Sequence, residues 1–175
     1  MGNESTIRIE SERAIDRVAL SALLIGAFEG AAEARLVDEL RRQAALTLSL
    51  VARVDGQLVG YVALSPVTLE PNVGGLRGVG LAPLAVLSAQ RKRGLGARLV
   101  EAALARARAL GFDFAVVLGD PAYYGRLGFT RADTRGLACV FSAPPGAFQV
   151  LELRAGALDG ARGLVRYHRA FDVFA

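Results

Sequence analysis

A basic, glycine-rich turn at residues 91–96 constrains the fold of this chain more than any other feature. An apolar run typical of a buried strand, residues 79–87, precedes it, and an alanine-rich segment with spaced arginines, residues 95–110, follows. This order predicts a strand, a tight turn and a long helix that begins within the turn. The first N–H groups of such a helix have no partner within the helix, so they face the turn.

The residues of the turn point to an anionic ligand. Gly94 and Gly96 lack Cβ atoms, so the backbone can take positive φ angles and approach a bound group closely. Arg91, Lys92 and Arg93 add full positive charges to the partial charge of the helix N-terminus. The turn therefore predicts a site for a phosphorylated cofactor, although an ordinary solvated connection between a strand and a helix can have the same composition.

Two common phosphate-binding motifs do not fit this turn. A Walker loop needs GxxxxGK followed by Ser or Thr, and a dinucleotide-binding turn needs a third glycine where Leu99 stands. Read as RxxGxG, with residues 84–86 leading in from the strand, the segment resembles the coenzyme A pyrophosphate loop of the GCN5-related N-acetyltransferase superfamily.

A second motif follows further along the chain. Residues 112–118 are rich in aromatic and β-branched side chains and predict a buried strand. Asp120 can cap a short helix, and Pro121 suits the first position of that helix. Gly128 can supply the left-handed residue that ends it, and Phe129 then begins the next strand.

This second motif resembles the same superfamily. The superfamily carries a short helix ending in YxxxGF after a strand, and Tyr124 occupies the tyrosine position. The sequence GDPAYYGRLGF, residues 119–129, further resembles a bacterial subgroup of N-acetyltransferases. The two motifs, in this order, place the core of the resemblance at residues 78–130.

The resemblance implies a single α/β domain over residues 1–175, with a mixed, mostly antiparallel central sheet flanked by helices. It implies acetyl-CoA as the cofactor and direct acetyl transfer to a primary amine of a small molecule or a peptide. A backbone N–H at or just after Val86 would polarise the acyl carbonyl, and Tyr124 would be the general acid. The implied cofactor-binding residues are Leu84, Ala85, Val86, Arg91, Lys92, Arg93, Gly94, Leu95, Gly96 and Ala97.

The general base is not identified by either motif. The resemblance implies a glutamate in or near the strand before the turn, but residues 78–86 contain no ionisable side chain. Glu29, Glu33 and Glu70 lie in segments expected to border the acceptor, although the residues themselves favour an ordinary solvated charge at each position. A chain of water molecules could serve instead. The asparagine often found after residues 112–118 in the superfamily is also absent.

Composition excludes several other classes of protein. The net charge of +4 is modest and the arginines are dispersed, which argues against a nucleic-acid partner. No apolar run is long enough to span a membrane, and the N-terminal segment lacks the pattern of a signal sequence. Cys139 is the only cysteine, which excludes an intrachain disulfide and suits the cytoplasm. At this length the core requires no structural metal.

Periodicity predicts alternating strands and helices outside the two motifs. The Asp55-Gly56 pair predicts a tight hairpin from residues 51–54 into residues 57–65. A helix over residues 31–43 should bury Leu36, Val37 and Leu40. Asp38 and Arg42 should pair on its outer face. The remaining predicted strands are residues 6–10, 138–141, 148–153 and 164–167. A further predicted helix is capped by Ser11, and its buried face should consist of Ile15, Val18, Ala19, Ala22 and Leu23.

Two other functions remain possible from the sequence. The missing strand glutamate would suit a module that binds acyl-CoA without catalysis. If RxxGxG is only a turn, the chain could instead be a protein-interaction domain. The long apolar C-terminal strands could also pair across a homodimer.

Overall fold

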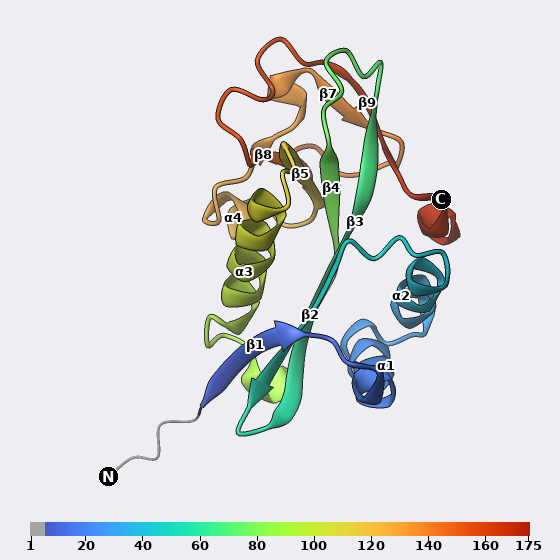
Figure 1. The fold of residues 1–175 in the computed structure, drawn as a ribbon, viewed down its shortest axis with the longest axis vertical. Helices are drawn as coiled ribbons and strands as arrows, with labels where there is room; N and C mark the ends of the chain where they lie inside the picture. Colours follow the sequence, from blue (N-terminus) through green and yellow to red (C-terminus); the bar gives the residue numbers. More distant parts are fainter. Residues whose placement is uncertain (1–5) are drawn as a thin grey trace.

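The computed structural model describes residues 6–175, which form a nine-stranded sheet with helices on both faces (Figure 1). The strands are β1 (Ile7–Ser11), β2 (Leu48–Val54), β3 (Gln57–Glu70), β4 (Gly78–Val86), β5 (Phe114–Leu118), β6 (Thr130–Arg131), β7 (Leu137–Cys139), β8 (Phe148–Glu152) and β9 (Gly163–Tyr167). The helices are α1 (Arg17–Phe28), α2 (Ala32–Arg42), α3 (Leu95–Ala109) and α4 (Pro121–Gly125), with short 3-10 helices η1 (Ala14–Asp16), η2 (Ser88–Gln90), η3 (Asp133–Arg135) and η4 (Arg169–Phe174).

The sheet is mixed and mostly antiparallel, which confirms the predicted fold class. Its order is β1-β2-β3-β4-β5-β8-β6, and β4 and β5 form the only parallel pair along this path within the described residues. Strand β9 pairs with the second half of β3 and with β7. Strands β8 and β9 each pair with two strands of the described chain, and a homodimer through the C-terminal strands stays a prediction.

The hairpin between β2 and β3 forms as predicted, but β3 is longer than expected. Asp55 and Gly56 take φ angles of 49° and 85°, which suits a two-residue turn. Strand β3 continues to Glu70 because residues 67–70 pair with β9. That partner lies far away in the sequence, so no local pattern signals the extension.

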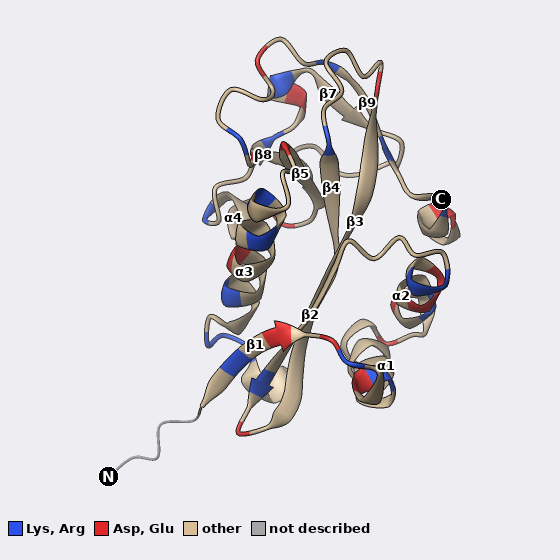
Figure 2. Ribbon diagram, in the orientation of Figure 1, with Lys and Arg blue, Asp and Glu red and all other residues tan. Residues whose placement is uncertain are grey.

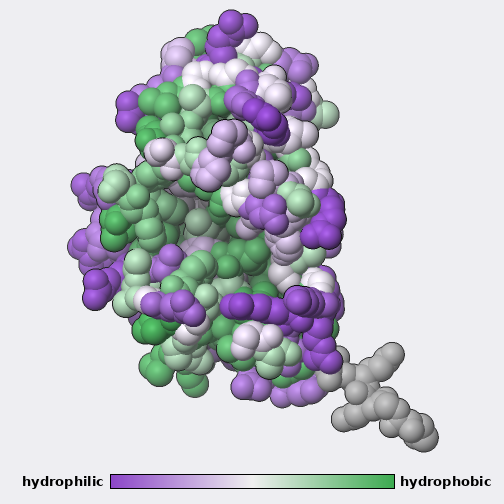
Figure 3. All heavy atoms as spheres, turned by 180° about the vertical axis from the view of Figure 1, so that it is seen from behind, coloured by the Kyte–Doolittle hydropathy of each residue, from purple (hydrophilic) through white to green (hydrophobic). Residues whose placement is uncertain are grey.

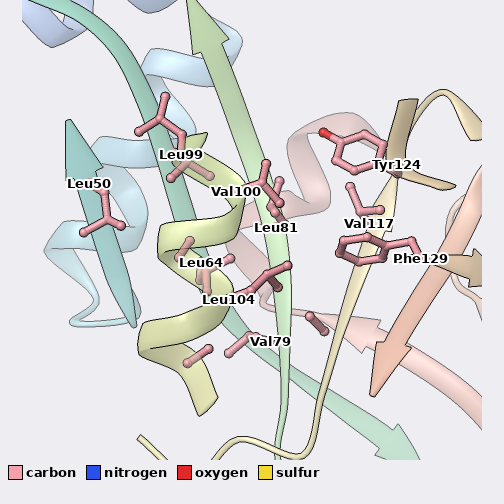
Figure 4. Close-up of a cluster of buried hydrophobic side chains, with 14 of the residues drawn as sticks. Leu50, Leu64, Val79, Leu81, Leu99, Val100, Leu104, Val117, Tyr124 and Phe129 are labelled. Atoms are coloured by element: carbon pink, nitrogen blue, oxygen red, sulfur yellow. The ribbon is translucent and has the colours of Figure 1, made fainter. Parts of the chain in front are cut away.

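The two faces of the sheet are covered by different helices. Helix α3 packs Leu99 and Leu104 on one face, against side chains such as Leu64 of β3 (Figure 4). Helices α1 and α2 pack on the other face, where Leu24 and Val37 belong to the same buried cluster as Tyr61.

The buried face of α1 differs from the prediction. Leu20, Leu23 and Leu24 are buried, so only Leu23 of the expected face is correct. Ile15 and Val18 are 81% and 84% exposed, and Ala19 and Ala22 are also exposed. The 3-10 turn η1 precedes α1 and changes its phase. Its buried Asp16 accepts a hydrogen bond from Arg53 Nη2 at 2.5 Å and thereby anchors this turn to β2.

Helix α2 buries Leu36, Val37 and Leu40 as predicted. The expected pairing of Asp38 with Arg42 is wrong, because Asp38 pairs with Arg41 and Arg42 pairs with Glu39, each at 2.5 Å. Both pairs are three residues apart, one of the two spacings that bring side chains together on a helix.

Two searches of the described part of the chain concern membrane spans and metal sites. Within residues 6–175, none of the helices combines the length and apolar character needed to cross a membrane. The same residues contain no group of three or more His, Cys, Asp or Glu side chains arranged to hold a metal ion.

Candidate active site

The parallel strands β4 and β5 pair at one end and diverge at the other. Residues 78–80 of β4 pair with residues 114–116 of β5, whereas β4 continues to Val86 and β5 to Leu118. The separation of the two strands is visible in Figure 4. We call the paired part the closed end and the diverging part, residues 81–86 and 117–118, the open end.

Strand β4 is interrupted at the start of the open end, as the position of Pro83 suggested. Leu81 pairs with Leu64 of β3, but Leu84 pairs with Val62, so two residues of β4 stand opposite one of β3. Such a bulge bends a strand and increases its twist. This bend separates β4 from β5. Pro83 contributes to the interruption, because a proline lacks the N–H group that a ladder hydrogen bond requires.

The backbone of Val86 faces the open end. The N–H of Leu87 donates to the carbonyl of Val59 on β3 at 2.8 Å. Neighbouring peptide groups of a strand point to opposite edges, so the N–H and C=O of Val86 point away from β3. The Val86 carbonyl accepts a hydrogen bond from Arg91 Nε at 3.0 Å, which attaches the basic turn to this edge.

The basic turn forms the predicted entry to a helix. Gly94 is the N-cap of α3 with a φ of 74°, and Lys92 also has a positive φ of 62°. Gly96 lies inside the first turn of the helix, so its expected positive φ is wrong. Glycine is needed there for a different reason, since a Cβ at Gly96 would lie 2.6 Å from the hydroxyl oxygen of Tyr123.

A cavity of about 240 Å³ lies at this helix N-terminus. The basic residues of the turn and further ones along α3 are shown in blue in Figure 2. Of the predicted cofactor-binding residues, Leu84, Ala85 and Arg93 are not among the described residues that line this cavity. Arg93 is exposed, and its side chain donates a hydrogen bond to Gln90. The cavity is lined by Val86, Gln90, Arg91, Lys92, Gly94, Leu95, Gly96, Ala97 and Tyr123.

Tyr124 is held at the open end by helix α4. The N–H of Ala122 donates to Asp120 Oδ1 at 2.9 Å, and Pro121 takes the first helical position, both as predicted. Helix α4 ends at Gly125, before Gly128, whose φ of 94° completes the following turn.

The ring of Tyr124 is packed, while its hydroxyl points toward β4 (Figure 4). The ring makes edge contacts with Tyr123 and Phe129, at centroid distances of 5.0 and 5.6 Å. A Cβ at Gly119 would lie 2.4 Å from this ring, so the glycine that follows β5 makes room for the tyrosine. Burial, with a smaller contribution from Tyr123, raises the pKa of the Tyr124 phenol well above its ordinary value.

A second cavity, of about 360 Å³, lies on the face covered by α2. Seen from behind, the molecule is hollowed at mid-height and apolar surface surrounds the hollow (Figure 3). One wall is residues 81–84 with Leu118 and Tyr124; the opposite walls are Phe28, Glu33 and Leu36, then Phe141 and Ser142, then Tyr167, Phe171 and Phe174. Helices α1 and α2 contribute to this wall, whereas residues 70–78 and 144–146 do not line the cavity within the described chain.

The three glutamates expected near the acceptor differ in position. Glu33 lines the larger cavity. Glu70 instead pairs with Arg166 Nε at 2.6 Å on the outer end of β3. Glu29 ends α1 in a left-handed conformation and is exposed. The structure therefore brings only Glu33 of the three to the cavity that Tyr124 also lines.

The closed end has a different composition from the open end. Asp113 accepts hydrogen bonds from the Arg77 N–H at 2.8 Å and from Arg154 Nε at 2.7 Å. The first of these is the largest cause that lowers the pKa of Asp113. Gly78 lies against the ring of Phe114, where a Cβ would come within 2.3 Å of a ring carbon. This end is consequently tightly packed and held together by the hydrogen bonds of Asp113.

Comparison with known proteins identifies the class to which this fold and site belong. The model of the Acetyltransferase (GNAT) family matches residues 17–129, and the chain belongs to that family. The uncharacterized N-acetyltransferase YhbS of Escherichia coli K12 is 45% identical over 167 residues, covering 95% of this chain and 99% of YhbS.

Two solved structures of the same family have a similar fold over nearly the whole chain. The Escherichia coli YhbS structure, in complex with CoA, has a TM-score of 0.89 and 44% identity and covers 98% of this chain and 93% of its own. A GNAT family acetyltransferase from Brucella melitensis, in complex with acetyl-CoA, has a TM-score of 0.78 and 35% identity, with coverage of 95% and 99%.

Sequence reasoning missed three contributors to the site. Gly119 makes room for Tyr124, and Tyr123 lines the cavity at the start of α3. The C-terminal aromatic residues of η4 form a wall of the larger cavity. For Gly119, the only signal in the sequence was its place directly before Asp120 and Pro121, where the short helix begins.

Proposed function

We propose that the chain transfers an acetyl group from acetyl-CoA to a primary amine of a small molecule or a peptide by direct attack. The observation that carries this proposal is the open end of β4 and β5. The Val86 N–H and the Tyr124 hydroxyl both face the open end. The open end lies between the smaller cavity at the start of α3 and the larger cavity on the face covered by α2.

Binding of acetyl-CoA is assigned to the smaller cavity. The N–H groups at the start of α3 and the side chains of Arg91 and Lys92 supply donors and positive charge for a pyrophosphate. Gly96 and Tyr123 shape the wall so that the group can approach the helix backbone. The complexes of the two related proteins with CoA and acetyl-CoA support the identity of the cofactor.

When bound, acetyl-CoA supplies an acetyl thioester at the open end. The Val86 N–H would donate a hydrogen bond to the thioester oxygen, where negative charge develops as the amine attacks. A donor fixed in a strand needs no reorganisation during the reaction. Because the Arg91 side chain donates a hydrogen bond to the Val86 carbonyl, the basic turn also holds this strand edge in position.

Tyr124 would protonate the departing sulfur. An ordinary phenol has a pKa of about 10, and burial raises that of Tyr124 further, so it carries its proton at neutral pH. General acid catalysis of this kind typically contributes about 10²- to 10⁴-fold in rate.

The test is a calorimetric titration with acetyl-CoA followed by an acceptor screen that detects the released CoA thiol. Saturable binding and one acceptor-dependent product are expected. Binding without any product would favour the non-catalytic acyl-CoA-binding module suggested by the missing strand glutamate. No binding by the folded protein would contradict the proposed function and favour an interaction domain.

A further inference from the structure

The larger cavity combines an aromatic wall with a single charged group. Six aromatic side chains line it: Phe28, Tyr124, Phe141, Tyr167, Phe171 and Phe174. Among residues 6–175, Glu33 is the only charged side chain on the wall. Pockets that bind small molecules typically have this composition, in which apolar surface supplies affinity and a few polar groups fix the orientation.

Glu33 presents a negative charge that its own chain does not neutralise. It is half-buried in the first turn of α2, and no described residue forms a hydrogen bond or an ion pair with its side chain. Glu39, two turns along the same helix, is bonded to both Arg42 and Gln43.

Tyr167 also lines this cavity, and its hydroxyl is a second group without a partner. The hydroxyl oxygen is buried and forms no hydrogen bond with a described residue. The ring lies over Gly80, where a Cβ would approach to 2.7 Å, so the glycine permits this position. A buried polar group without a partner costs free energy, which a ligand that supplies the missing hydrogen bond would recover.

We propose that the acceptor is a small primary amine with one positive charge and an aromatic or bulky apolar body, bound through its ammonium by Glu33 and the Tyr167 hydroxyl. An ammonium has three N–H donors, and both of these groups accept hydrogen bonds. This inference rests on the proposed function and names the substrate class of that same site.

The charges of the wall exclude two other classes of amine. A polyamine would bring further positive charges into an apolar cavity with one carboxylate, and each unpaired charge is costly to desolvate. The carboxylate of an amino acid would meet Glu33 without a cationic partner on the wall. The aromatic rings can pack against an apolar body and attract the ammonium through their faces.

Glu33 also supplies the proton acceptor that the strand before the basic turn lacks. Its carboxylate takes one proton from the ammonium and leaves a neutral amine. The nitrogen lone pair then forms the C–N bond to the acetyl carbon, and the C–S bond breaks. Tyr124 gives its proton to the sulfur, the nitrogen returns a proton to the Tyr124 phenolate, and Glu33 releases its proton to solvent.

The experiment compares matched acceptors on the full-length protein with acetyl-CoA. The probes are 2-phenylethylamine, L-phenylalanine, spermidine and a lysine-containing peptide, and the readout is kcat/KM from thiol release. We expect kcat/KM for 2-phenylethylamine to exceed that for each of the other probes by at least about tenfold. For L-phenylalanine and spermidine the reason is that a desolvated unpaired charge costs more than about 1.4 kcal/mol. Equal values, or a preference for any of the other three, would overturn the proposal.

Two variants test the binding residues directly. Glu33→Gln should weaken 2-phenylethylamine binding about 10- to 100-fold, as expected for a charge-assisted hydrogen bond, and should reduce discrimination against L-phenylalanine. Calorimetry of 2-phenylethylamine with the protein, with and without CoA, measures this independently of turnover. Glu29→Gln, which changes an exposed glutamate outside the cavity, is the control and should leave binding unchanged.

Tyr167→Phe separates a binding role from a packing role. It keeps the ring over Gly80 and removes the unpartnered hydroxyl, so thermal stability should be equal or higher while amine binding falls by about 2- to 10-fold. Lower stability with unchanged amine binding would overturn the role of Tyr167.

The outcomes distinguish this inference from the function on which it rests. If acetyl-CoA does not bind to the folded protein, the proposed function fails and the inference fails with it. If acetyl-CoA binds but 2-phenylethylamine neither binds nor is acetylated, the inference alone is overturned.

Discussion

The two ends of the β4 and β5 pair are built from neighbouring residues but have opposite properties. At the closed end, ladder hydrogen bonds join residues 78–80 to 114–116, and Asp113 connects the chain before β4 to the chain after β8. At the open end, a bulge separates the strands, and the two cavities and Tyr124 occupy this region.

Glycine has a different role at each end. Gly78 allows the ring of Phe114 to pack tightly at the closed end. Gly96 and Gly119 instead make room for Tyr123 and Tyr124, which line the smaller and the larger cavity respectively. The comparison suggests that changes at the closed end alter stability, whereas changes at the open end alter binding and rate.

The largest expected effect is on cofactor binding at the open end. Gly96→Glu places a carboxylate in the small cavity where a pyrophosphate would lie, and like charges brought together cost several kcal/mol. We expect acetyl-CoA affinity to fall by more than about 100-fold in calorimetry. Gly26→Glu, on an exposed part of α1 with no neighbour within 4 Å, is the control. Equal affinities in the two variants would mean that the turn does not bind the cofactor.

The second effect is on rate. Tyr124→Phe keeps the ring and removes the proton donor, so kcat should fall by about 10²-fold or more while acetyl-CoA affinity stays within twofold or so. Tyr61→Phe, which removes a buried hydroxyl bonded to Ser49 and not to the site, should change stability only. Unchanged turnover in Tyr124→Phe would remove this residue from the mechanism.

The third effect is on packing at the closed end. Gly78→Ala forces a Cβ against the ring of Phe114 and should destabilise the protein by about 1–3 kcal/mol in urea unfolding. Acetyl-CoA affinity of the folded protein should not change. Phe114→Leu should make the same glycine substitution less costly, which a double-mutant cycle measures. A purely additive cycle would contradict the packing account.

The smallest effect is electrostatic. Hydrogen bonds lower the pKa of Asp113 in the folded state, so its contribution to stability is present above its unfolded pKa of about 3.9 and is lost as pH falls below that value. Asp113→Asn should cost about 1 kcal/mol at pH 7 and reduce the loss of Tm between pH 5 and 3. An identical acid profile in the variant would rule out this contribution.

Local patterns were sufficient where the structure depends on neighbours in sequence. The Asp55-Gly56 hairpin, the Asp120 cap and the order of strand, turn and helix around Gly94 are all of this kind. The family resemblance added the cofactor and Tyr124, and the roles of individual site residues stay predictions.

Where distant contacts decide the structure, the sequence was insufficient. Helix α1 has apolar residues on several sides, so periodicity could not show that Leu20 rather than Val18 is buried. Phe171 and Phe174 reach the larger cavity only because β9 crosses to the far half of β3. The proximity of Tyr123 to Gly96 likewise depends on how α4 packs beside α3.

Hydrogen exchange with and without acetyl-CoA would test the contrast between the two ends most directly. The account predicts slower exchange of the amides at residues 84–97 when acetyl-CoA is present, and no change at residues 78–80 and 114–116. Unchanged exchange at residues 84–97 under saturating acetyl-CoA, or protection confined to other segments, would contradict the assignment of the open end as the cofactor site.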